Sequence, residues 1–285
     1  MYDGKPMSLK RPRNGIDLIL GLITTATLFF LFIPIGFVVA HSFTDARAFF
    51  VWGGFTTKWY SSMWDNAQLT NSVVVSFKAA AGSTLIAVVL GSFAGIALAR
   101  RPGKWVAVFM AVILLILTTP EIVDAIGLQL WFVRLGGPFR TGLLPLWLGQ
   151  SIFSSAVVTL IVRARMSGLD ESLEQAAADL FATPRKAFLQ ITLPLVAPAI
   201  LAGGLLAFTF SLDNVVVAQF VSSPGTSTYP VYVFGLARSV VKPEVGAMAT
   251  VLLGATLVSL ILVAVVLRRS GDSASKIAAT FTGTN

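Results

Sequence analysis

Three carboxylates interrupt strongly apolar stretches of the sequence. Glu121 and Asp124 lie three residues apart, and Asp213 lies in the segment FSLDNVVV, directly before Asn214. An ionised group inside a membrane is costly, so it needs a partner, a water-filled cavity or a place at the end of a span. Bases are not equally frequent nearby. The three acids and Asn214 therefore predict a cavity that binds a cation through charge-assisted hydrogen bonds.

The depth of the acids supports a shared cavity. Counted along continuous helices at 1.5 Å per residue, Glu121 lies about 24 Å, Asp213 about 27 Å and Asp124 about 28 Å from the same side. Pro120 can kink its helix and expose carbonyl groups to the cavity. The alternative is that the spans end here and the acids contact outside water. The sequence leaves both open for Glu121 and Asp124, and favours the cavity for Asp213.

Aromatic residues near the acids can add cation–π contacts. Trp131, Phe132 and Tyr229 are the candidates, and the direction in which each one faces is open. Lys78 lies within another apolar stretch, where it is either an internal counter-ion or a side chain that reaches the interface. The second interpretation is favoured, because long basic side chains near helix ends commonly do this.

The elements that carry these residues are membrane spans. The chain is 55% hydrophobic and 12% charged, with a mean hydropathy of +0.82, whereas soluble domains have about 25% charged residues. We predict an all-α membrane protein with tails at 1–17 and 268–285 and a membrane domain at 18–267. Its six predicted helices cover 18–41, 71–99, 105–130, 143–163, 195–218 and 246–267.

The basic residues predict the orientation of the spans. Most of the 21 Lys and Arg residues lie in segments that are inside if the N-terminus is inside, so both termini are predicted to be cytoplasmic. The net charge of +8 then reflects topology and contacts with anionic lipid headgroups rather than nucleic acid. With no cysteine and only His41, we expect no thiol chemistry and no metal site.

The polar segment 170–194 separates two predicted spans and lies on the cytoplasmic side in this orientation. Asp170 and Thr183 are suitable helix caps, so the segment predicts two short helices over 171–180 and 184–192. One interpretation is an amphipathic hairpin that rests on the bilayer, which periodicity alone favours. The other is a docking element for a cytoplasmic protein.

At this hairpin the chain resembles the membrane subunits of ABC importers, and most of all the polyamine (spermidine/putrescine) permease group. The family pattern is E-A-A, three residues, G, nine residues, I-x-L-P. Ala176, Ala177, Ile191, Leu193 and Pro194 fall at its spacings. Further similar segments lie at 55–63, 119–126, 208–225 and 241–250. The resemblance implies that 170–194 is a helix-turn-helix coupling segment that seats in a groove of an ATPase subunit.

Two positions differ from the family pattern. Gln175 stands at the family Glu, and Phe181 stands at the family Gly. Glu174 comes one position early, which rotates it by about 100° around the helix. Phe in a left-handed turn costs roughly 1 kcal/mol or more. The residues implied in ATPase coupling are Glu174, Gln175, Ala176, Ala177, Asp179, Phe181 and Arg185.

The resemblance also implies an assembly and a function. It implies a permease in the bacterial inner membrane that imports polyamines or similar cations by alternating access, with a second permease as a heterodimer, two ATPase subunits and an extracytoplasmic solute-binding protein. Without a phosphate-binding G-x-x-x-x-G-K-[ST] motif in this chain, ATP and Mg are expected on the partner ATPase. The loop 222–230 would contribute to the outer mouth.

Other functions stay open at this point. One alternative is an ABC permease for another solute, such as an opine, a metal chelate or a phosphonate-like anion. A second is an ion-coupled secondary transporter, which would need no ATPase. An intramembrane enzyme would need a carboxylate pair such as Glu121 and Asp124 and would leave the hairpin without a role, so we expect no catalytic residues here.

Overall fold

The computed structural model describes residues 15–46, 51–101, 103–236 and 242–269. These residues form helices joined by short connections, and their one extended pairing is an antiparallel bridge between Thr44 and Phe55. The predicted all-α class is therefore confirmed for the described part of the chain. The chain divides into two compact units, residues 66–240 and residues 1–65 with 241–285.

The unit formed by the two ends of the chain contains α1 (Gly15–His41), α2 (Lys58–Asp65) and α12 (Pro243–Arg269). Both α1 and α2 pack against α12. The connection between α1 and α2 is held by the indole Nε1 of Trp59, which donates to the Thr44 carbonyl at 2.6 Å. The large apolar side chains of α1 are exposed, as expected for a helix that faces lipid or another membrane protein.

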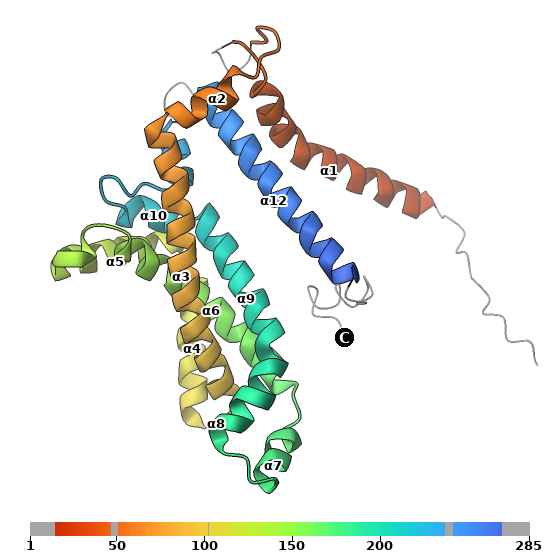
Figure 1. Cartoon of the computed structure of the whole chain (residues 1–285), viewed down its shortest axis with the longest axis vertical. Helices are drawn as coiled ribbons and strands as arrows, with labels where there is room; N and C mark the ends of the chain where they lie inside the picture. The colour runs from red at the N-terminus through yellow and green to blue at the C-terminus, as the bar shows by residue number, and fades with distance from the viewer. Residues whose placement is uncertain (1–14, 47–50, 102, 237–241, 270–285) are drawn as a thin grey trace, which may run out of the picture. The chain divides into compact units, whose positions relative to one another are not determined.

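Three long helices form the centre of the second unit (Figure 1). They are α3 (Ala67–Arg100), α6 (Leu144–Ser167) and α9 (Leu193–Asp213). At Gly95 a Cβ atom would lie 2.8 Å from the Thr159 carbonyl oxygen and 2.9 Å from the Arg163 nitrogen. A Cβ atom at Gly91 would lie 2.7 Å from the Cβ atom of Val158. These small residues let the backbones of α3 and α6 approach closely, as such residues do in membrane helices.

A buried polar network joins the same three helices. The Ser83 hydroxyl of α3 donates to the Ser211 hydroxyl of α9 at 2.9 Å, and Ser211 donates to the side-chain carbonyl of Gln150 on α6. All three side chains are buried. In an apolar interior these hydrogen bonds fix the register of the helices, because an unpaired group there costs about 1–3 kcal/mol.

The helix predicted over 105–130 is not continuous, and Pro120, where the sequence allowed a kink, lies at the break. The structure has two helices, α4 (Lys104–Thr118) and α5 (Glu121–Leu135), bent by 102° at the break between them. Pro120 lacks an N–H and disfavours helical backbone in the residue before it. Thr119 is accordingly extended, with ψ 133°. The depths counted for Glu121 and Asp124 along a straight helix are therefore wrong.

The fifth predicted span, 195–218, is also interrupted. Helix α9 ends at Asp213, Asn214 is extended, and α10 (Val216–Val221) begins after it. The loop that follows leads to α11 (Tyr229–Leu236). The loop is tied to the start of α3, since the Asn71 amide donates to the Gly225 carbonyl at 3.1 Å and the Tyr229 N–H donates to the Ser76 hydroxyl at 2.8 Å.

The hairpin differs from its prediction at its second helix. Helix α7 (Ser172–Asp179) and the short α8 (Pro184–Ala187) are present, with Asp170 and Thr183 capping backbone N–H groups. The helix does not end at Leu193-Pro194 but passes through a π-turn at Phe188–Thr192 into α9. The wider turn, in which Leu193 N–H donates to the Phe188 carbonyl, accommodates Pro194 without a break.

Several helices are long enough to cross a membrane. Among the residues that the structure describes, four helices qualify by length and composition, and the bent pair α4–α5 makes a fifth if it is one span. Their ranges are Asp17–His41, Ala67–Arg100, Leu144–Ser167 and Pro184–Asp213. Helix α12 contains a shorter apolar stretch, Pro243–Val258. Six spans therefore stay a prediction, as does the orientation of the termini.

Candidate functional site

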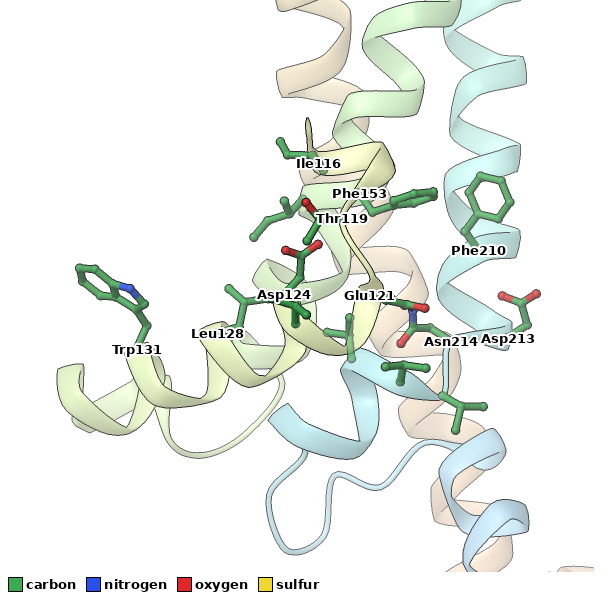
Figure 2. Close-up of a pocket in the computed structure, with 17 residues that line it drawn as sticks. Ile116, Thr119, Glu121, Asp124, Leu128, Trp131, Phe153, Phe210, Asp213 and Asn214 are labelled. Carbon is green, nitrogen blue, oxygen red and sulfur yellow. The ribbon is translucent and has the colours of Figure 1, made fainter. Parts of the chain in front are cut away.

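A pocket of about 700 Å³ lies in the second unit, where α5 and α10 begin and α9 ends, beside the first half of α6 (Figure 2). Its lining includes all four residues predicted for the substrate path, Glu121, Asp124, Asp213 and Asn214. They come from segments about 90 residues apart in the sequence. The two helix breaks that the sequence did not predict bring these side chains together.

The helix ends give the three acids different electrostatic surroundings. Glu121 and Asp124 lie in the first turn of α5, where the helix dipole stabilises a negative charge. Asp213 is the last residue of α9, where the dipole and the final carbonyl groups already place partial negative charge. Asp213 therefore gains most from a bound cation, and Glu121 and Asp124 have a stabilising role at a helix start in any case.

Asn214 connects the acids to the fold. Its side-chain amide donates to the Glu121 carboxylate, and its side-chain carbonyl accepts from the Ala218 N–H at 3.1 Å. The same side chain thus caps α10 and fixes Glu121 at the start of α5. Glu121 is already engaged in this bond, whereas Asp124 and Asp213 make no ion pair with any described side chain.

The remaining walls of the pocket are largely apolar and aromatic. Trp131 lines the pocket, as do Phe153 and Phe210, whose rings meet edge to face with centroids 5.7 Å apart. Of the predicted cation–π candidates only Trp131 lies there. Phe132 is buried against Phe139 in the apolar core, and Tyr229 is not among the lining residues.

The pocket has no basic lining residue among those that the structure describes. Lys78 is exposed elsewhere on α3, and its backbone carbonyl accepts a hydrogen bond from the Trp147 indole N–H at 2.8 Å. Within the described ranges, no group of three or more acids and histidines is placed to hold a metal ion. The pocket thus combines unpaired carboxylates with aromatic faces, which suits an organic cation.

The second candidate region is the hairpin at the far end of the same helices, where α7 and α8 lie beyond the end of α3 (Figure 1). Arg100, the last residue of α3, holds it in place. Its guanidinium lies 3.3 Å from the carboxylates of Glu171 and Glu174 and donates to the Leu169 carbonyl. Thr192, in the π-turn, also donates to Glu174, at 3.0 Å.

These contacts separate the predicted coupling residues into two groups. Glu174 is half-buried and Ala177 is buried, so both face the chain itself. The others are exposed and available to another protein: Gln175, Ala176, Asp179, Phe181 and Arg185. Glu174 therefore has an internal structural contact, in agreement with its one-residue displacement from the family Glu.

Phe181 occupies a left-handed turn. Its φ of 58° is positive, and it follows α7 at the position where helices most often place Gly. The Phe181 N–H donates to the Ala178 carbonyl and the Ala182 N–H donates to the Ala177 carbonyl, the two bonds that close a Schellman motif. The geometry that the family Gly supplies is therefore retained, at a cost of about 1–2 kcal/mol for a side chain there.

Sequence reasoning missed several residues that the structure makes important. Arg100 entered the sequence analysis only as one of the basic residues that predict the orientation, although only 15% of its side chain is exposed. Phe153 and Phe210 gave no signal, because aromatic residues are common in apolar spans. Ser211 and Gln150 did carry a signal in the sequence, because polar side chains inside apolar helices usually pair with each other.

Comparison with known proteins shows which family the chain resembles. Residues 87–270 match the family model described as "Binding-protein-dependent transport system inner membrane component". The chain is 40% identical to the putrescine transport system permease protein PotI of Escherichia coli (strain K12) over 232 residues, 79% of this chain and 82% of that protein. It is 35% identical to the spermidine/putrescine transport system permease protein PotC of the same strain over 244 residues, 86% of this chain and 92% of that protein.

A solved structure has a similar fold at low sequence identity. It is a bacterial ABC transporter involved in the import of the acidic polysaccharide alginate. The two chains are 14% identical with a TM-score of 0.66, and the match covers 91% of this chain and 99% of the other. This likeness concerns the arrangement of the helices alone.

Proposed function

The chain belongs to the family of binding-protein-dependent transport system inner membrane components, and we propose that, as the permease subunit of such an ABC importer, it moves polyamines or similar organic cations. The observation that carries this proposal is the pocket. Three carboxylates from two distant segments line one cavity of about 700 Å³ without a basic lining residue among those described.

The pocket chemistry suits a flexible chain with more than one ammonium group. One ammonium is held by Asp213 at the end of α9, where carbonyl groups and the helix dipole add to the carboxylate charge. Another is held by Asp124, and the methylene groups between them pass along the Phe153–Phe210 pair, while Trp131 lies beyond Asp124 (Figure 2). The names of PotI and PotC, which transport putrescine and spermidine, support the same substrate class.

The hairpin would provide the coupling to ATP hydrolysis. In this proposal six spans cross the membrane with both termini in the cytoplasm, and α7 and α8 seat in a groove of an ATPase subunit. Closure of two ATPase subunits moves the hairpin, and the continuous helix from Pro184 to Asp213 carries the movement to the pocket. A second permease completes the pathway as a heterodimer, and an extracytoplasmic binding protein delivers the substrate.

Neutralising one pocket acid tests the substrate assignment. We expect Asp213→Asn to lower polyamine uptake by the reconstituted importer at least tenfold, because a charge-assisted hydrogen bond contributes about 1.5–3 kcal/mol. The complex should assemble normally. Asp17→Asn, an exposed acid in the first turn of α1, is the control and should leave uptake unchanged. Uptake is measured with putrescine and spermidine as competing substrates. Wild-type uptake by Asp213→Asn would remove the cavity assignment.

Charge reversal in the hairpin tests the coupling assignment. We expect Asp179→Lys or Arg185→Glu to weaken ATPase association or to reduce substrate-stimulated ATP hydrolysis. Arg101→Glu is the control, because it is exposed near the same helix ends and lies outside the hairpin. Stimulated hydrolysis at the wild-type rate in both hairpin variants would count against the proposal, and so would a purified assembly without any ATP-hydrolysing subunit.

A further inference from the structure

The tip of the hairpin carries two adjacent apolar side chains that contact little of their own chain. Leu180 is 82% exposed and Phe181 is 96% exposed. No other large apolar side chain among the described residues is as exposed as Phe181, and the most exposed phenylalanine of α1 reaches 76%. Such full exposure at a turn is costly in water, so the two residues indicate a surface that another molecule covers.

The backbone at Phe181 strengthens this interpretation. The turn requires a left-handed residue, and Gly or Asn would satisfy it without the steric cost of a phenylalanine Cβ. The ring makes no compensating packing within the chain, as its exposure shows. A strained residue whose side chain faces away from its own fold is explained by a contact outside the fold.

The position of the tip argues against lipid as the covering molecule. Helix α3 has 34 residues and is about 51 Å long, whereas the hydrocarbon core is about 30 Å thick. The hairpin lies beyond the end of α3 (Figure 1), and the charged cluster of Arg100, Glu171 and Glu174 lies at its base. The tip is therefore displaced from the apolar layer, and a water-soluble protein is the occupant that can reach it.

We infer that Leu180 and Phe181 form an apolar knob that inserts into a hydrophobic hollow on the ATPase subunit. Asp179 and Arg185, both exposed beside the knob, form the polar rim of this contact. The inference rests on the proposed function and adds a specific requirement to it. The partner ATPase must have a hollow that accepts a phenylalanine ring opposite residue 181, so Phe181 selects that ATPase over one with a flat surface there.

Two substitutions separate docking from turn geometry. Phe181→Gly and Phe181→Asn both fit a left-handed backbone and both remove the ring. We expect each to leave the thermal stability of the isolated permease unchanged or slightly higher. The affinity of the purified ATPase subunit for the permease complex in nanodiscs should fall about tenfold to hundredfold, the equivalent of losing one buried aromatic side chain. Leu201→Ala, which removes an exposed side chain of α9, is the matched control and should bind normally.

A label at the tip identifies the occupant. Because the chain has no cysteine, Leu180→Cys gives a single site at the exposed tip for an environment-sensitive fluorophore and keeps the Phe181 ring. We expect a solvent-exposed signal in nanodiscs without ATPase and a shift to an apolar signal when the ATPase is added. An apolar signal that is already present without ATPase would assign the knob to lipid and overturn the inference.

The outcomes distinguish this inference from the proposed function. If Phe181→Gly and Phe181→Asn bind the ATPase as tightly as the wild type does, the knob is wrong, and the coupling role of the hairpin stands. If the wild-type complex binds no ATPase at all, the proposed function fails and the knob fails with it.

Discussion

The pocket and the hairpin are built from the same helices in opposite ways. The pocket forms where helices stop, since α9 ends and both α5 and α10 begin at its walls. The hairpin is joined to its span without a stop, because α8 passes through the π-turn into α9. Helix ends can shift relative to one another without loss of intrahelical hydrogen bonds, whereas an unbroken helix moves as one body.

This difference assigns distinct mechanical roles to the two regions. The helix from Pro184 to Asp213 has 30 residues and is about 45 Å long. Thr192 near one end bonds Glu174 of the hairpin, and Asp213 at the other end lines the pocket. A displacement of the hairpin is therefore expected to change the position of an acid in the pocket, while Glu121 and Asp124 stay with α5.

The largest expected effect comes from breaking the packing that both regions share. In Gly95→Val the added Cβ atom would lie 2.8 Å from the Thr159 carbonyl oxygen of α6. This is too close for a carbon atom, so the two helices must separate. We expect a destabilisation of about 3 kcal/mol or more and little assembled protein after detergent extraction. Gly21→Val is the control, because no atom lies within 4 Å of a Cβ added there. Equal yields of the two variants would contradict the close packing of α3 and α6.

A smaller effect is expected from releasing the hairpin alone. Arg100→Ala removes the bonds to Glu171, Glu174 and the Leu169 carbonyl, and leaves the half-buried Glu174 carboxylate without its cation, at a local cost of about 1–3 kcal/mol. We expect uptake to fall about tenfold, faster amide hydrogen exchange over residues 170–187, and an almost unchanged melting temperature.

Two further variants sharpen the interpretation of Arg100→Ala. Arg100→Lys keeps one charge contact and should retain part of the activity, because lysine cannot reach both carboxylates and the carbonyl with one rigid fork. The neighbouring Arg101 is exposed, so Arg101→Ala should resemble the wild type. Slow exchange over 170–187 in Arg100→Ala would show that the hairpin is held by other contacts.

The sequence predicted the features that depend on local interactions, and it missed those that depend on contacts between distant segments. Apolar length predicted the spans, and local capping rules predicted the start of α7 and of α8 at Asp170 and Thr183. The breaks after Thr118 and Asp213 were missed, because a proline or a single polar residue within a long apolar run is compatible with either a kinked or a broken helix. The outcome depends on tertiary packing, such as the bond from Asn214 to Glu121.

The four residues predicted for the substrate path nevertheless line one pocket, and their role in transport stays a prediction. Their selection depended on the cost of charge in an apolar segment, which does not change with the path of the helix. The distance argument for Glu121 and Asp124 depended on a straight helix and was wrong for that reason. Arg100 was missed because its partners, Glu171 and Glu174, lie some 70 residues later and no local pattern joins them.

The smallest effect is expected from loosening the pocket without changing its charge. Asn214→Ala removes the donor to Glu121 and the cap of α10, a loss of about 1 kcal/mol. We expect the KM for polyamine uptake to rise about threefold to tenfold with a nearly unchanged kcat, since the hairpin and its coupling are intact. Gln219→Ala, an exposed polar residue of α10, is the control. A variant Asn214→Ala that lowered kcat and left KM unchanged would mean that this junction belongs to the coupling movement rather than to the binding of the cation.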